Sequence, residues 1–122
     1  MRTPANVLVT GGAGFIGSNF IHYLFDQPDF AGRVINLDKL TYAGNLLNLR
    51  DVEAAQGGGR YVFQRGDIAD APTVERVFRD YQIDTVVHFA AESHVDRSVH
   101  FPREFIHSNL VGTFNLLEAA RQ

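Results

Sequence analysis

The glycine-rich stretch TGGAGFIGS at residues 10–18 constrains this chain more than any other part of its sequence. It joins an apolar run at residues 7–9 to an amphipathic run, an order that predicts a buried strand, a tight turn and a helix. Gly11, Gly14 and Gly17 would let the backbone turn sharply and let an anion approach the amino end of that helix closely. A turn that needs glycine only for a positive φ is the structural alternative.

A second apolar run ends in an acidic residue, Asp38, which lies 21 residues after Gly17. In a dinucleotide-binding unit, a carboxylate at this place accepts hydrogen bonds from the adenosine ribose and disfavours a 2′-phosphate. The spacing therefore predicts a site for NAD. Lys39 leaves NADP open, because its cation can pair with a phosphate, and a turn-forming role for Asp38 is also open.

Hydrophobic periodicity divides the chain into alternating strands and helices. Continuous apolar runs favour parallel strands that are buried on both faces. The alternation implies right-handed crossovers, so we expect an α/β fold: a partial doubly wound parallel sheet in the order 3-2-1-4 with flanking helices. The expected strands are residues 6–10, 33–37, 61–63 and 85–89, and the expected helices are residues 14–25, residues 45–55 and residues 102 onward. A further helix is expected after Asp70, with an apolar stripe at Val74, Val77, Phe78 and Tyr81.

Some details of the helices follow from single residues. Asp70 is the expected N-cap of the third helix, with Pro72 in its first turn. Gly112, inside the last helix, is expected to mark close packing or a nearby ligand. The pattern of that helix continues to Gln122, so residues 1–122 are expected to be an incomplete N-terminal NAD-binding domain. The expected apolar stripe of the last helix is Phe105, Ile106, Leu110, Phe114 and Leu117.

The loops after the strands carry polar residues toward one edge of the predicted sheet. Asp67 and Ile68 follow the third strand and are candidates for contact with an adenine, with an Asx turn at Asp67 as a close alternative. Residues 89–98 place polar side chains beyond two alanines, which leave room for a flat ring or a ribose. These loops converge on the edge where ligands bind in such sheets.

Three further interpretations of the segment after the fourth strand are weaker. His94, Asp96 and Ser98 do not predict a catalytic triad, because residues so close in sequence rarely have its geometry. Glu92 and Asp96 have an alternative role as surface partners of Arg97. The histidines do not cluster in the sequence, so no metal site is predicted.

Composition narrows the class of protein. The 122 residues have a formal net charge of −3, which argues against nucleic acid as the main partner. The sequence contains no stretch apolar and long enough for a signal peptide or a membrane span. Without cysteine there are no disulfides or thiolate metal sites, and a cytoplasmic location is expected. His88, in the fourth strand, is expected to be a satisfied buried histidine.

With these motifs in view, the chain resembles the N-terminal part of the dTDP-glucose 4,6-dehydratases, members of the extended short-chain dehydrogenase/reductase superfamily with a Rossmann-type fold. The motifs that carry the resemblance are TGGAGFIGS at 10–18, LDKLTYAGN at 37–45, GDI at 66–68, AAESHVDRS at 90–98 and NLVGTFNLLEAAR at 109–121. The motif at 10–18 is common to the superfamily, whereas those at 37–45 and 90–98 are more specific.

The resemblance implies roles for individual residues. Phe15 and Ile16 would contact the pyrophosphate of NAD, and Ser93 and Asp96 would reach a nucleotide-sugar substrate, dTDP-glucose. A homodimer is also implied. The remaining implied cofactor contacts are Asp38, Lys39, Leu40 and Thr41 at the ribose, Asp67 and Ile68 at the adenine, and Phe89, Ala90, Ala91, Glu92, Ser93 and Ser108 along the cofactor.

The family chemistry also requires a Tyr-x-x-x-Lys pair and a Thr-Asp-Glu segment, and neither occurs here. Lys39 is the only lysine, and the residue four positions before it is Ile35. We therefore expect no turnover by these residues alone. An NAD-binding regulatory module and a fragment of a related sugar-nucleotide epimerase or decarboxylase are the alternatives. The fourth strand would be an apolar sheet edge, which favours self-association.

Overall fold

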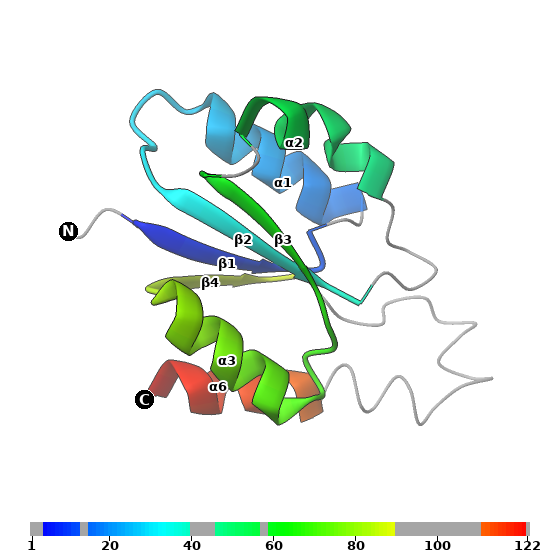
Figure 1. The fold of residues 1–122 in the computed structure, drawn as a ribbon, viewed down its shortest axis with the longest axis vertical. Helices are drawn as coiled ribbons and strands as arrows, with labels where there is room; N and C mark the ends of the chain where they lie inside the picture. The colour runs from blue at the N-terminus through cyan, green and yellow to red at the C-terminus, as the bar shows by residue number, and fades with distance from the viewer. Residues whose placement is uncertain (1–3, 13–14, 40–45, 57–58, 90–110, 122) are drawn as a thin grey trace.

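The computed structural model of this chain describes residues 4–12, 15–39, 46–56, 59–89 and 111–121. Its strands are β1 (Asn6–Thr10), β2 (Arg33–Asp38), β3 (Tyr61–Arg65) and β4 (Thr85–His88). They form one parallel sheet in the order β3-β2-β1-β4, which confirms the predicted topology. All four strands end at the same edge, on the right of Figure 1. We call this the carboxyl edge.

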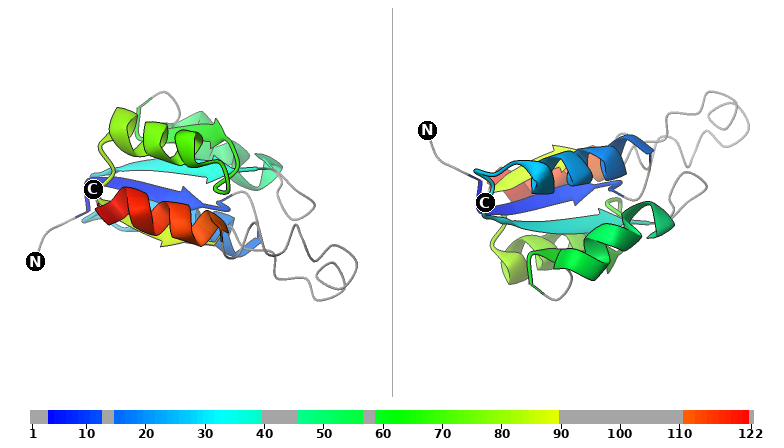
Figure 2. Two further views of the ribbon diagram at one scale, coloured as in Figure 1. Left: turned by 90° about the horizontal axis from the view of Figure 1, so that it is seen from below. Right: turned by 90° about the horizontal axis from the view of Figure 1, so that it is seen from above.

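The helices form a layer on each face of the sheet, as Figures 1 and 2 show. One layer contains α1 (Phe15–Asp26) and α2 (Arg50–Gln56), and the other contains α3 (Ala71–Tyr81) and α6 (Gly112–Arg121). The helix expected at residues 45–55 begins as a short 3₁₀ helix, η1 (Leu46–Leu49). The expected start of the last helix, at residue 102, lies outside the described residues.

Strand side chains alternate between the two faces, so the sheet supports two apolar layers. Val7 and Val9 of β1 point toward the α1 and α2 layer, whereas Leu8 between them points toward the α3 and α6 layer. The buried residues of the first layer are Val7, Val9, Ile21, Phe30, Val34, Leu49, Val52 and Tyr61. Those of the second are Leu8, Ile35, Leu37, Ile68, Val74, Val77 and Leu116.

The apolar stripe predicted for the last helix is wrong in its described part. Phe114 and Leu117 are 60% and 66% exposed, whereas Gly112 and Leu116 are buried. Gly112 sets the rotation of α6, because a Cβ at this position would collide with the side chain of Ile68. Since apolar residues stand at both 116 and 117, periodicity alone allows either stripe. The predicted close packing at Gly112 is confirmed.

The amino end of α3 lies where the sequence predicts it, but the cap is formed differently from the expectation. Asp70 stands at the N-cap position, but its side chain makes no capping hydrogen bond to the helix. Its carboxylate instead accepts a hydrogen bond from the hydroxyl of Thr73. Pro72 occupies the first turn as predicted, and Gln82 ends the helix in a left-handed conformation with φ of 49°.

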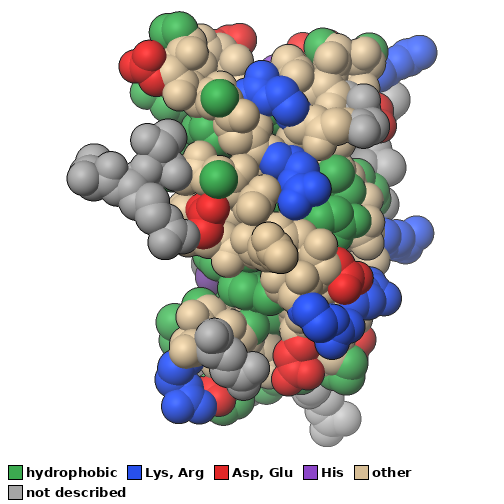
Figure 3. Space-filling view, turned by 60° about the vertical axis from the view of Figure 1, so that its left-hand side comes forward, with side chains coloured by type: hydrophobic (Ala, Val, Ile, Leu, Met, Phe, Trp, Pro, Cys, Tyr) green, Lys and Arg blue, Asp and Glu red, His purple; other side chains and the backbone are tan. Residues whose placement is uncertain are grey.

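The surface at the amino ends of the strands carries charges of both signs. Figure 3 shows arginine side chains there between Asp and Glu side chains. At the start of β4, Asp84 accepts hydrogen bonds from the main-chain amides of Ala5 and Asn6. Among the described helices, none has the length and apolar character needed to cross a membrane.

Candidate functional site

The glycine turn between β1 and α1 lies at the carboxyl edge. Gly11 has φ of 71°, a left-handed conformation that favours glycine, and its N–H donates to the carbonyl of Leu37 at 3.0 Å. A Cβ on Gly17 would collide with the carbonyl oxygen of Gly11, so the first turn of α1 rests directly on the loop. The first N–H groups of α1 have no intrahelical partner and point back toward this edge.

A buried amide lies beneath the same turn. Asn36 of β2 is fully buried, and its Oδ1 accepts a hydrogen bond from the N–H of Gly12 at 3.0 Å. Its Nδ2 donates to the hydroxyl of Tyr61 at 3.1 Å. Burial raises the pKa of Tyr61 despite this hydrogen bond, so the phenol stays protonated. Asn36 was not among the predicted site residues, although an Asn within an otherwise apolar strand is a visible signal.

Three of the predicted binding residues come together where β2 and β3 end. Asp38 is buried at the end of β2, and its carbonyl accepts the N–H of Gly66 at 3.1 Å. The ammonium of Lys39 lies 3.5 Å from Oδ2 of Asp67. The other carboxylate oxygen of Asp67 accepts the N–H of Ala69 at 2.9 Å, which is the Asx turn named as the alternative.

Ile68 joins this edge to α6. Its side chain is only 4% exposed and packs against Gly112. Its carbonyl accepts a hydrogen bond from Nδ2 of Asn115 at 2.8 Å. The Ile68 side chain is therefore part of the core, and any contact between this residue and a ligand would be made by its main chain.

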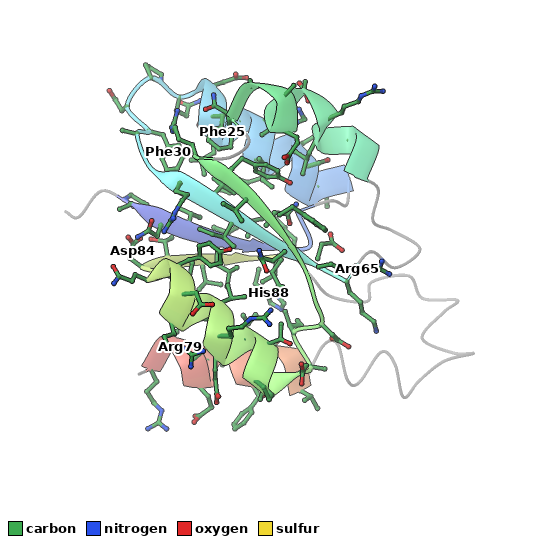
Figure 4. The ribbon with its side chains drawn as sticks, viewed as in Figure 1. Phe25, Phe30, Arg65, Arg79, Asp84 and His88 are labelled. Atoms are coloured by element: carbon green, nitrogen blue, oxygen red, sulfur yellow. The ribbon has the colours of Figure 1, made fainter. Side chains whose placement is uncertain are left out.

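His88, labelled in Figure 4, links the ends of β1 and β4 to α6. Its Nδ1 lies 2.6 Å from Oγ1 of Thr10, and its Nε2 lies 3.1 Å from Oγ1 of Thr113. The N–H of Phe89 donates to the same Thr10 hydroxyl, which directs the hydroxyl hydrogen toward Nδ1. This is the pairing of a neutral ring, and burial lowers the pKa of His88. The predicted hydrogen bonding of His88 is confirmed, but the residue is half-buried and not buried as expected.

Comparison with known families decides the classification. Residues 8–122 match the family model described as GDP-mannose 4,6 dehydratase. The chain belongs to this family. It is also similar to dTDP-glucose 4,6-dehydratase 1 of Escherichia coli (strain K12), with 53% identity over 94% of this chain and 30% of that relative. This member of the GDP-mannose 4,6 dehydratase family thus spans about a third of the length of the curated relatives it matches.

Solved structures of two kinds share the fold. One is DesIV, a dTDP-glucose 4,6-dehydratase from Streptomyces venezuelae with NAD and TYD bound, with a TM-score of 0.84 and 48% identity over 94% of this chain and 35% of that one. Another is UDP-glucose 4-epimerase of Thermus thermophilus in complex with NAD, with a TM-score of 0.80 and 39% identity over 96% of this chain and 34% of that one. The resemblance drawn from the motifs is confirmed at the level of the family.

The described part of this family member brings together some of its predicted site residues and omits others. Ile16 is 66% exposed at the start of α1, and Phe89 packs against Phe20 with 5.6 Å between ring centroids. In the described ranges, no three His, Asp or Glu side chains lie close enough to hold a metal ion. Predicted residues outside the described ranges are Gly14, Leu40, Thr41, Ala90, Ala91, Glu92, Ser93, Asp96 and Ser108.

The pH dependence of stability follows from His88. Because burial lowers its pKa in the folded chain, the unfolded chain takes up the proton first, near the ordinary histidine pKa of about 6.5. The stability that depends on the neutral ring is thus complete above that pH and decreases as the pH falls below it. Chemical denaturation between about pH 7 and about pH 5 should show a smaller loss of unfolding free energy in His88→Gln than in the unsubstituted chain.

His22 provides a control with the opposite sign. A hydrogen bond from its Nε2 to Asp51, at 2.8 Å, raises the pKa of His22. The stability that His22 contributes is present below the pKa that it has in the unfolded chain. This stability is lost as the pH rises through the pKa of His22 in the folded chain. His22→Gln should therefore lose more stability on acidification than the unsubstituted chain. Equal losses in all three proteins would contradict the assignment of a neutral, hydrogen-bonded His88.

Proposed function

We propose that the carboxyl edge binds NAD. The left-handed turn at Gly11 and the absence of a side chain at Gly17 let a pyrophosphate approach the amino end of α1. The carboxylate of Asp38, at the end of β2, suits the hydroxyls of the adenosine ribose. The only lysine, Lys39, has Asp67 as an ion-pair partner at 3.5 Å, which favours NAD over NADP.

We assign the contacts of the cofactor by region. Because the Ile68 side chain packs against Gly112, its contact with the adenine would be made through the main chain. The assignments are Gly11, Gly14, Phe15, Ile16 and Gly17 at the pyrophosphate; Asp38, Lys39, Leu40 and Thr41 at the ribose; and Asp67 and Ile68 at the adenine. Phe89, Ala90, Ala91, Glu92, Ser93 and Ser108 would line the rest of the cofactor, and Ser93 and Asp96 would contact the sugar nucleotide.

We further propose that this is the NAD-binding part of a dTDP-glucose 4,6-dehydratase. The observation that carries this proposal is the 53% identity to the Escherichia coli enzyme across 94% of the chain. When bound, NAD would accept a hydride from C4 of the glucose and later return it to C6. Water would be lost across C5 and C6 between these two transfers. The chain's own part is to hold the cofactor and the nucleotide end of the substrate. A cytoplasmic location suits a chain without cysteine.

An assay with dTDP-glucose and NAD tests this function. The protein as its gene encodes it should form the 4-keto-6-deoxy product, whereas residues 1–122 alone should form none. The reason is that a Tyr-x-x-x-Lys pair, in which the lysine lowers the pKa of the tyrosine base, does not occur in these residues. Product from residues 1–122 alone would overturn this account.

A sugar-nucleotide epimerase is the second candidate. The 39% identity to the Thermus thermophilus epimerase over 96% of the chain supports it. Epimerisation of UDP-glucose without loss of water, and no reaction with dTDP-glucose, would favour this candidate. NAD binding with neither reaction in the protein as encoded would favour a regulatory module.

Self-association is expected through the outer face of α6. Phe114 and Leu117 lie one turn apart and are 60% and 66% exposed, so pairing with a second copy would remove both from water. Light scattering over a concentration series should show a dimer that dissociates more readily in the Phe114→Ser, Leu117→Ser double variant. Tyr23→Ser is the matched control, because Tyr23 is 61% exposed on α1, in the other helix layer.

The sheet edge gives a second route to association. β4 is an outer strand of the described sheet, and a strand with unpaired backbone groups can pair with another chain. If the double variant associates as strongly as the unsubstituted chain, the α6 surface is not the interface. A monomeric mass for both proteins at high concentration would contradict the homodimer proposal itself.

A further inference from the structure

Asn36 is a polar residue in a place that an apolar residue would suit. It lies in β2 between Ile35 and Leu37, and none of its surface is exposed. Burying an amide without partners costs about 1–3 kcal/mol, so a buried Asn persists where its hydrogen bonds are needed. Both ends of this amide are used, at 3.0 Å and 3.1 Å.

The chemistry of the two partners fixes the orientation of the amide. The N–H of Gly12 can only donate, so the Asn36 atom that faces it is the oxygen. The nitrogen then faces the hydroxyl of Tyr61, which is itself 2% exposed and belongs to β3. The glycine turn thus donates a hydrogen bond to Asn36 of β2, and Asn36 in turn donates one to Tyr61 of β3.

The glycine turn is seated closely on this amide. A Cβ placed on Gly12 would lie 2.6 Å from Cγ of Asn36 and 2.6 Å from Cδ1 of Ile21. Because the Gly12 N–H donates to the buried Asn36 oxygen, it is directed into the protein and is occupied there. Among the described residues, the next amides along the chain that can meet an anion at the carboxyl edge are those of Phe15 and Ile16, in the first turn of α1.

We propose that Asn36 is a positioning residue for the cofactor: by accepting the Gly12 N–H, it holds the glycine turn so that the first amides of α1 face the pyrophosphate. This inference rests on the proposed NAD site. A leucine at this position would fill a similar volume, but it would leave a buried N–H without a partner and would free the turn to shift.

Hydrogen exchange of single amides tests the inference without any substitution. In the protein free of NAD, the Gly12 amide should exchange at least tenfold more slowly than an unstructured amide. On addition of NAD, the amide resonances of Phe15 and Ile16 should shift more than that of Gly12. Exchange of Gly12 at the rate of an unstructured amide would overturn the inference, whether or not NAD binds.

A pair of variants then separates positioning from stability. Asn36→Leu should bind NAD about tenfold more weakly, the effect of losing one buried hydrogen bond, while its affinity for adenosine, which has no pyrophosphate, should stay within twofold. Tyr61→Phe is the matched control, because it keeps the bond between Gly12 and Asn36 and should bind NAD within twofold of the unsubstituted protein.

The outcomes distinguish the two proposals. Equal NAD affinity in Asn36→Leu, or an equal loss for NAD and adenosine, would overturn the positioning role. If Asn36→Leu does not fold, the exchange rate of Gly12 in the unsubstituted protein decides. The unsubstituted protein could also fail to bind NAD although its Gly12 amide is protected from exchange. That result would overturn the proposed function and the positioning role of Asn36, while the hydrogen bond from Gly12 to Asn36 would stand.

Discussion

Gly17→Ala is expected to unfold at a much lower denaturant concentration than the unsubstituted chain. The added Cβ would meet the Gly11 carbonyl oxygen and would lie 2.9 Å from Cα of Gly12. These are backbone atoms of a tight turn, which cannot move aside as the end of a flexible side chain can. We expect a loss of about 3 kcal/mol, at the upper end of the usual cost of overpacking. Chemical denaturation followed by circular dichroism measures it.

Gly59→Ala is the control for this prediction. A Cβ at Gly59 meets nothing within 4 Å, so this variant should stay within about 0.5 kcal/mol of the unsubstituted chain. Gly17→Ala should also lose NAD binding, because α1 and the turn can no longer keep their spacing. A Gly17→Ala protein with an unchanged denaturation midpoint would show that the helix does not pack on the turn as described.

Asp38→Ala is expected to weaken NAD binding by about 10- to 100-fold, the effect of losing a hydrogen bond to a charged group. Its preference for NAD over NADP should also shrink, because a carboxylate at this position repels a 2′-phosphate. Asp38→Asn, which keeps the shape and removes the charge, should lose the preference while keeping more of the affinity. Isothermal titration with each cofactor measures both effects.

The control for Asp38 is an exposed acid far from the turn. Asp80→Ala removes the same charge from α3, where the side chain is 51% exposed, and should leave both affinities unchanged. If Asp38→Ala binds NAD as tightly as the unsubstituted chain, Asp38 is only the last residue of a strand. An unchanged preference for NAD over NADP would remove the role of its charge.

Much of the fold was predictable because its signals are local. The apolar residues at 7–9 and at 34, 35 and 37, with the glycines between them, specify two parallel strands and the turn. The sheet order follows from alternation and handedness, which leave few topologies. Gly11 and Gly17 have conformational and steric requirements that only glycine meets, so their structural roles were visible in the sequence.

Two of the features that were missed depend on distant partners, and the third depends on a competing neighbour. The inward face of α6 is chosen by the fit of Gly112 against Ile68, 44 residues earlier in the sequence, and not by the period of its apolar residues. The partner of Asn36, in the same way, is a main-chain amide 24 residues away. Asp70 occupies the cap position, but its nearest hydroxyl, on Thr73, competes for the carboxylate.

Mapping NAD onto assigned amide resonances tests the central claim most directly. We predict saturable binding, with the largest shifts at the carboxyl edge, at Gly11, Asp38 and Asp67. The opposite end of the sheet has its own groove between α3 and α6, lined in part by Glu75 and Asp84. Absence of saturable binding, or shifts confined to that groove, would contradict the account.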